Sequence, residues 1–123
     1  MGRTMYDMAC ESVGYNKTYD IRGFIDDNTH ALDSFPNYPP MLSTIADYHP
    51  QTDDVFICSI GGSSRRKCME EIIARGGHFL TMIHRTARIG TNVQIGEGTI
   101  IGAFTTVGAD AHIGKCNLIQ SYT

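Results

Sequence analysis

Two groups of residues follow predicted strands, at places where parallel sheets commonly bind ligands. Asp26 and Asp27 come directly after the stretch DIRGFI, and carboxylates there accept hydrogen bonds from the hydroxyl or base N–H groups of a nucleotide. Gly61, Ser63 and Arg65 follow the stretch VFICSI, at the carboxyl edge of the expected sheet, where ligands gather. The residues predict a nucleotide-type site, with a solvated turn at the acids and a surface cation at Arg65 as the alternatives.

The elements that must position these residues follow a strand–helix–strand pattern. VFICSI is a nearly continuous apolar run, as in a strand buried on both faces. The stretch SSRRKCMEEIIARGG predicts a helix that is capped by Ser63 or Ser64 and ends at Gly76–Gly77. HFLTMI follows as a further strand. At these lengths the pattern predicts a βαβ unit and a small parallel sheet.

Earlier residues also carry helical and strand patterns. TYDIRGFIDD reads as a strand that ends in two acids, and a short helix is expected around Thr44–Tyr48. The stretch GRTMYDMACESVG predicts a helix with Gly14 as its carboxyl-terminal cap. The apolar face of this helix is expected to hold Tyr6, Ala9, Cys10 and Val13.

From Ile83 onward the sequence repeats every six residues, a period of neither a strand nor a helix. The repeated aliphatic positions are Ile83, Ile89, Ile95, Ile101, Val107, Ile113 and Ile119. A glycine follows these residues at positions 90, 96, 102, 108 and 114. A small or short residue stands two positions before them, at Ala87, Val93, Thr99, Thr105, Ala111 and Asn117.

A period of six is typical of a parallel β-helix with three short strands in each coil. Residues three repeats apart then stack at about 4.8 Å. Three inner columns are expected, formed by Ile83–Ile101–Ile119, by Ile89–Val107 and by Ile95–Ile113. The small residues also point inward beside a corner, and the glycines suit the tight turns where the chain leaves the strand conformation.

Composition excludes several classes of function. The 123 residues are 41% hydrophobic and carry a net charge of −3, so no basic face for nucleic acid is indicated. No apolar run approaches the roughly 18 residues of a membrane span, and the expected location is the cytoplasm. The four cysteines match no zinc pattern and are expected to be reduced. No metal site is expected, because His84 and His112 lie at different phases of the repeat.

The repeat resembles that of the left-handed β-helix acyltransferases. The motifs RGFIDDN, FICSIGGSSRRK and GHFLTMIHRTARIG narrow the resemblance to sugar O-acyltransferases of the sialic-acid O-acetyltransferase type. These include N-acetyltransferases that act on nucleotide-linked 4-amino sugars. The resemblance implies a Rossmann-like sugar-nucleotide domain over residues 1–83 and a left-handed β-helix over 84–123. It also implies acetyl-CoA as co-substrate and a homotrimer with its active sites between subunits.

The resemblance also assigns roles to residues of this sequence. Gly2 and Arg3 match the end of a Gly-rich turn whose backbone N–H groups hold a phosphate. Asn28 joins Asp26 and Asp27 in holding the uridine end, and Arg65 matches the family's arginine. The family usually has an asparagine where Ser63 or Ser64 stands. The remaining histidines are given no catalytic role: His84 is read as a structural residue of the domain boundary, His112 as a surface residue, and His30, His49 and His78 have no supporting context.

The sequence departs from this family at both ends. An apolar strand would precede the Gly-rich turn, and without it the sheet is expected to have unpaired edges. The family's catalytic histidine would fall about four residues beyond Thr123, and the acetyl-CoA groove lies on later coils. These residues are therefore expected to contain no catalytic residue and to have little or no transferase activity.

Two functions fit these observations. The first is an acetyltransferase, present as a fragment, that transfers acetyl from acetyl-CoA to an amine or hydroxyl of a nucleotide-activated or sialic-acid-like sugar. The second is a non-catalytic sugar-nucleotide binding module that has lost its catalytic coils. An oxidoreductase is disfavoured, because the sequence has no complete G-x-G-x-x-G motif. The acceptor sugar and the acceptor atom stay open.

Overall fold

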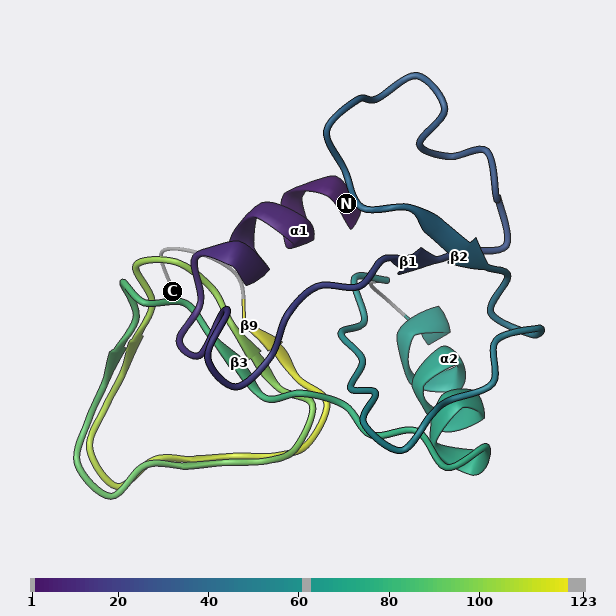
Figure 1. Ribbon diagram of the computed structural model, residues 1–123. Helices are drawn as coiled ribbons and strands as arrows, with labels where there is room; N and C mark the ends of the chain where they lie inside the picture. The colour runs from purple at the N-terminus through teal and green to yellow at the C-terminus, as the bar shows by residue number, and fades with distance from the viewer. Residues whose placement is uncertain (1, 61–62, 120–123) are drawn as a thin grey trace.

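The computed structural model describes residues 2–60 and 63–119. Its first part holds helices α1 (Gly2–Cys10) and α2 (Ser63–Ala74) and strands β1 (Phe24–Ile25) and β2 (Met41–Ser43). Figure 1 shows these elements beside a triangular winding of the later chain. The winding carries short strands only, namely β3 (Met82–Ile83), β4 (Arg88–Ile89), β5 (Gln94–Ile95), β6 (Ile100–Ile101), β7 (Thr106–Val107), β8 (His112–Ile113) and β9 (Leu118–Ile119).

Helix α1 packs against the first strand column of the winding. Met5 and Ala9 are buried with Met82 and Ile100 in one hydrophobic cluster. The predicted face was wrong at Val13, which is 67% exposed. The helix ends at Cys10, and Ser12 then forms an antiparallel bridge to His84. Helical spacing therefore does not extend to Val13, although a left-handed turn does occur at Gly14, with φ of 95°.

Helix α2 ends where the sequence predicts. The N–H of Gly76 donates to the C=O of Ile73, and the N–H of Gly77 donates to the C=O of Ile72. These two bonds and the φ of 90° at Gly76 form a Schellman cap. Met69 and Ile72 face the protein interior, where they contact a second hydrophobic cluster that contains Cys58 and Phe79.

The sheet in the first part is smaller than the sequence predicts. The segments before and after α2 run parallel to each other, as predicted. Among the described residues they are paired by one isolated bridge, between Phe56 and Phe79. Val55 and Ile60, at the ends of the expected strand, are exposed. Strands β1 and β2 form a separate parallel pair. The predicted helix at Thr44–Tyr48 was wrong, since that segment contains a single turn closed by the Tyr48 N–H and the Thr44 C=O.

The winding stacks its strands with the predicted register. Strands β3, β6 and β9 form one parallel column, β4 and β7 a second, and β5 and β8 a third. The paired residues are those expected from a period of six: Ile83 with Ile101, Ile101 with Ile119, Ile89 with Val107, and Ile95 with Ile113. Backbone hydrogen bonds such as Gly90 N–H to Val107 C=O, at 2.8 Å, hold successive turns together.

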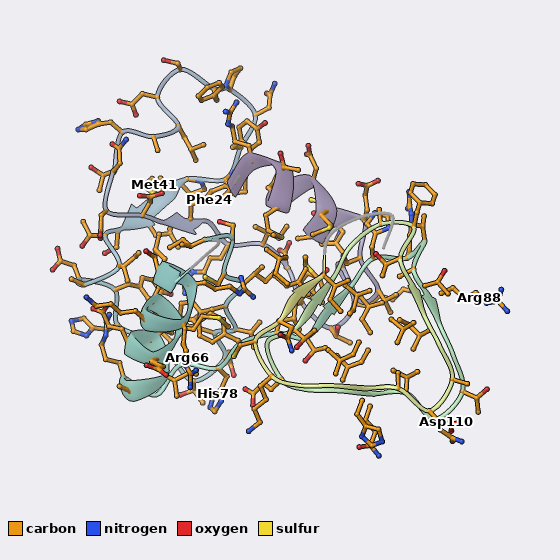
Figure 2. The ribbon with its side chains drawn as sticks, turned by 180° about the vertical axis from the view of Figure 1, so that it is seen from behind. Phe24, Met41, Arg66, His78, Arg88 and Asp110 are labelled. Carbon is orange, nitrogen blue, oxygen red and sulfur yellow. The ribbon has the colours of Figure 1, made fainter. Side chains whose placement is uncertain are left out.

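Burial within the winding follows the number of stacked neighbours. Ile101 has a partner on both sides and is 0% exposed. Val107 stacks on one partner and is 7% exposed. The small residues Thr99 and Thr105 are also buried, and the Thr99 hydroxyl donates to the Gly114 carbonyl at 2.6 Å. Figure 2 shows Arg88 and Asp110 on the outer side of the winding, away from the helices.

Among the repeated glycines, Gly90 and Gly96 serve close packing between turns rather than the corner conformation that the sequence suggested. Positive φ occurs two positions after the glycine, at Asn92, Gly98, Phe104, Asp110 and Cys116. At Gly96, by contrast, an added Cβ would lie 2.5 Å from the backbone of Gly114 and Lys115. A side chain there would therefore collide with the next turn of the winding.

This packing role predicts that alanine is destabilising at Gly96 and tolerated at Gly108. Gly96→Ala should lower the free energy of unfolding by about 1–3 kcal/mol, because the methyl group meets backbone. Gly108→Ala should leave stability unchanged or raise it by about 0.4–1 kcal/mol, because an added Cβ meets no described atom within 4 Å. Urea unfolding would measure both, and equal losses in the two variants would contradict the packing role.

Candidate functional site

One of the two predicted groups, the acidic pair Asp26 and Asp27, borders a cavity of about 270 Å³. Asp26 and Asp27 enter it from the carboxyl end of β1. The segment 57–60 borders it from the loop that leads to α2. Its remaining walls are mainly apolar and include Phe56, Ile72 and Phe79. The cavity therefore combines an apolar interior with carboxylates at one side.

Local hydrogen bonds fix the acidic end of this cavity. One carboxylate oxygen of Asp26 accepts the Asn28 N–H at 2.9 Å. One oxygen of Asp27 accepts the Ile45 N–H at 3.4 Å. No hydrogen bond between described residues engages the second oxygen of either carboxylate. These two oxygens can therefore accept hydroxyl or N–H donors from a ligand.

Other predicted site residues lie apart from this cavity or outside the described chain. Gly61 is outside the described residues, and Ser63 is the first residue of α2. Gly2 begins α1, and the Arg3 guanidinium stacks on the Phe35 ring at 3.7 Å from its centroid. Asn28 is exposed beside the acids, and its own side-chain oxygen accepts an N–H from the following turn.

Arg65 is neither a surface cation nor a group that borders the cavity. Its side chain is buried and donates to the carbonyl of Cys58 and, at 3.2 Å, to the carbonyl of Cys116. The second terminal nitrogen of the guanidinium has no hydrogen-bond partner among the described residues. Arg65 thus joins the loop before α2 to the winding. Cys116 lies far from Arg65 in the sequence, so the sequence pattern does not predict this contact.

Cys68 adds a thiol to the cavity wall. Burial, with Cys58 nearby, raises the pKa of Cys68 to about 11. A thiol with that pKa stays protonated near neutral pH, and the nucleophilic form of cysteine is the thiolate. Cys68 is therefore a wall residue rather than a nucleophile.

His84 joins the two parts of the chain. It is buried, and its Nδ1 accepts the N–H of Thr86 at 3.1 Å. Its Nε2 lies 3.6 Å from a carboxylate oxygen of Glu11. These contacts belong to the junction rather than to the cavity. His112 is exposed on β8.

A second, larger groove of about 580 Å³ was not predicted by any sequence motif. Near one end, the Tyr48 hydroxyl donates to Asp54 at 2.6 Å, and the Arg22 guanidinium lies 3.3 Å from the same carboxylate. The Tyr48 hydrogen bond holds the pKa of Asp54 below its ordinary value. Burial opposes this shift, and the Gln51 N–H and Arg22 reinforce it. Only the fold brings these distant residues together.

Comparison with known proteins gives no independent assignment. No protein-family model matches the chain, and no curated protein matches it significantly. Within residues 2–60 and 63–119, no three His, Cys, Asp or Glu side chains are grouped as metal ligands. No helix in those segments is long and apolar enough to cross a bilayer. The functional inference therefore depends on the residues and geometry described above.

The buried guanidinium predicts a stability role for Arg65. Arg65→Met should lower the free energy of unfolding by about 2–4 kcal/mol, because the variant loses charge-assisted bonds to the carbonyls of Cys58, Ile60 and Cys116. Arg66→Met is the matched control, since the Arg66 side chain is 87% exposed and, among the described residues, pairs only with Glu70 on the helix surface. Chemical denaturation would compare them, and equal stability of the two variants would remove the proposed linkage.

The Asp54 cluster predicts acid sensitivity. Because the folded-state pKa of Asp54 is lowered, its contribution to stability is present above about pH 4 and is lost as pH falls below that value. Asp54→Asn should therefore flatten the loss of stability as pH falls below about 4. Asp47→Asn, at an exposed position, should keep the parent slope. Urea midpoints measured across this range would test the difference, and an unchanged slope in Asp54→Asn would refute the assignment.

Proposed function

We propose that the chain belongs to an acetyltransferase that acts on a nucleotide-activated or sialic-acid-like sugar. It comprises the sugar-nucleotide-binding part of that enzyme and the first coils of its β-helix. The donor is acetyl-CoA, and the acceptor is an amine or hydroxyl of the sugar. In this proposal, residues 1–83 form an incomplete Rossmann-like domain and residues 84–123 begin a left-handed β-helix. The intact enzyme is a cytoplasmic homotrimer.

The observation that carries this proposal is the cavity between the end of β1 and the loop before α2. Asp26 and Asp27 border it beside largely apolar walls. A nucleotide base and ribose require this combination, because a flat apolar surface holds the base and carboxylate oxygens accept N–H or O–H donors. The second oxygens of the two acids, which no described residue engages, supply those acceptors. A uridine-type nucleoside fits this chemistry. Asp26 and Asp27 would accept hydrogen bonds from its N–H and O–H groups.

The winding supports the acyltransferase part of the proposal. Its three columns of short parallel strands repeat with the spacing of a hexapeptide coil. The motifs before it come in the order found in sugar acyltransferases. Arg65 attaches the loop beside the cavity to this winding, so a sugar nucleotide in the cavity would be held at a fixed place relative to later coils. The general base, a histidine, is expected beyond Thr123.

The alternative proposal is a non-catalytic sugar-nucleotide binding module. The same cavity supports it, and it requires no residue beyond those described. The encoding reading frame distinguishes the two proposals. A Gly-His pair about four residues after Thr123 would favour the acetyltransferase, whereas a stop codon directly after Thr123 would favour the binding module.

Titration of the chain with UDP tests the proposed nucleotide site. We expect binding, with heat measured by calorimetry and amide shifts around Asp26 and Asp27 measured by NMR. Asp27→Asn should weaken binding about tenfold or more, because a charge-assisted hydrogen bond contributes about 1.5–3 kcal/mol. Asp110→Asn makes the same charge change on the outer side of the winding and should bind UDP like the parent.

Two results would contradict the proposal. Absence of UDP and UDP-sugar binding to the folded parent would remove the nucleotide site. Release of CoA from acetyl-CoA by these 123 residues, in the presence of a UDP-4-amino sugar, would show that the general base lies within the chain. A thiol-reactive dye measures that release, and no turnover above the uncatalysed rate is expected.

A further inference from the structure

Two cysteine side chains border the smaller cavity from different elements. Cys58 lies in the segment before α2, and Cys68 lies on α2 itself. Cys58 is 6% exposed, whereas Cys68 is half-buried. Both are free thiols in this structure. The wall of the cavity therefore carries a pair of thiols, of which Cys68 is the more accessible.

Packing between the segment and the helix brings the two thiols together. Cys58 is buried in one hydrophobic cluster with Met69 and Ile72 of α2. Met69 directly follows Cys68, and Ile72 lies one helical turn after it, on the same side of α2. The side chains of Cys58 and Cys68 also share a hydrogen bond. The two sulfur atoms are therefore neighbours, although they belong to different elements.

Arg65 holds the backbone of Cys58 against the same helix. Its guanidinium donates to the carbonyl of Cys58 and, at 3.5 Å, to the carbonyl of Ile60. Arg65 lies about one turn before Cys68 on α2, and its side chain is buried. A disulfide requires Cα atoms within about 7 Å of each other and sulfur atoms that face each other. The Arg65 contacts keep the Cys58 segment at the helix, which favours that geometry.

The other two cysteines have different neighbours. Cys10 ends α1, where a hydrogen bond with its side chain raises the pKa of Tyr6. Cys116 belongs to the winding, where its Sγ lies 3.9 Å from the carbonyl oxygen of Glu97. Because Cys116 packs against the edge of the Cys58 cluster, a bond between these two cysteines is the outcome that an experiment must distinguish.

We propose that Cys58 and Cys68 are a redox pair, which a small organic disulfide such as oxidised glutathione converts to an intrachain disulfide. The Cys68 thiolate attacks one sulfur of the reagent, whose S–S bond breaks to release one thiolate. The Cys58 thiolate then attacks the Cys68 sulfur of this mixed disulfide and releases the second thiolate. The two protein thiols lose two electrons to the reagent, and their two protons pass to the released thiolates.

The protonation state of Cys68 sets the rate of this reaction. Its pKa is raised to about 11, first by burial and then by Cys58. Only about one molecule in ten thousand then carries the reactive thiolate near neutral pH. The thiolate fraction rises about tenfold for each pH unit below the pKa, so oxidation should be slow near neutral pH and accelerate as pH rises.

The same chemistry slows the reverse reaction. Reduction by an external thiol must expel Cys68 or Cys58 as a thiolate, and a thiolate whose pKa is high is a poor leaving group. Once formed, the bond would therefore persist and fix residues 57–60 to α2 along the cavity wall. The pair acts as a slow covalent link rather than a rapid switch, and it does not depend on nucleotide binding.

The test exposes the reduced full chain to oxidised glutathione between about pH 7 and about pH 9. Samples are quenched with acid, and the remaining thiols are alkylated with N-ethylmaleimide before mass spectrometry. Trypsin cleaves after Arg65, Arg66 and Lys67, and so places Cys58 and Cys68 in separate peptides. We expect a disulfide that joins these two peptides and forms about 100-fold faster at the upper pH than at the lower.

Single variants separate the two steps of the reaction. Cys58→Ala should stop at the mixed disulfide between Cys68 and glutathione, because the second thiol is missing. Cys68→Ala should form no such link. Cys10→Ala and Cys116→Ala are the matched controls, and both should form the parent link at the parent rate. Urea unfolding verifies that each variant is folded, and the peptide map and pH profile of the parent decide the proposal if a core variant is not.

Several results would overturn the proposal. These are no link between Cys58 and Cys68 in the folded parent at any pH, a predominant link to Cys116, or the same rate of linkage at all pH values. Formation of the link only in urea would assign it to the unfolded chain and would also overturn the proposal. UDP titration is a separate measurement, so failure of either proposal can be recognised independently.

Discussion

Parallel backbone pairing between residues three repeats apart is the constraint on which the rest of the structure depends. Each short strand of the winding contains only two residues and has little stability by itself. Stacking gives each strand its hydrogen bonds and encloses the aliphatic columns, so Ile101 becomes fully buried while the outer positions remain partly open. The close approach of turns then explains glycine at positions such as Gly96.

The same winding supplies a surface for the first part of the chain. Helix α1 buries Met5 and Ala9 against Met82 and Ile100. His84 bridges to the segment after α1, and Arg65 connects the loop before α2 to the Cys116 carbonyl. The first part has few paired strands of its own. Its contacts with the winding therefore help to hold it in place. The cavity beside Asp26 is thereby held at a definite position beside the winding.

The first part contains two hollows with different linings. The smaller cavity has carboxylate oxygens and apolar walls, which suit a nucleoside. The larger groove is lined by aliphatic side chains and, near one end, by the carboxylates of Asp20, Asp53 and Asp54. They meet at Ile25, Phe56, Ile57 and Ser59, which border both.

The sequence by itself determined the features that depend on local order or strict repetition. The period of six predicted the residue pairs of the winding, and Gly76–Gly77 predicted the end of α2, because each depends on fixed spacing along the chain. Only the tertiary structure decided the exposure of Val13, the single turn at Thr44–Tyr48, the burial of Arg65 and the true reason for Gly96. Each of these depends on which distant backbone or side chain lies nearby, and spacing along the chain does not specify that neighbour.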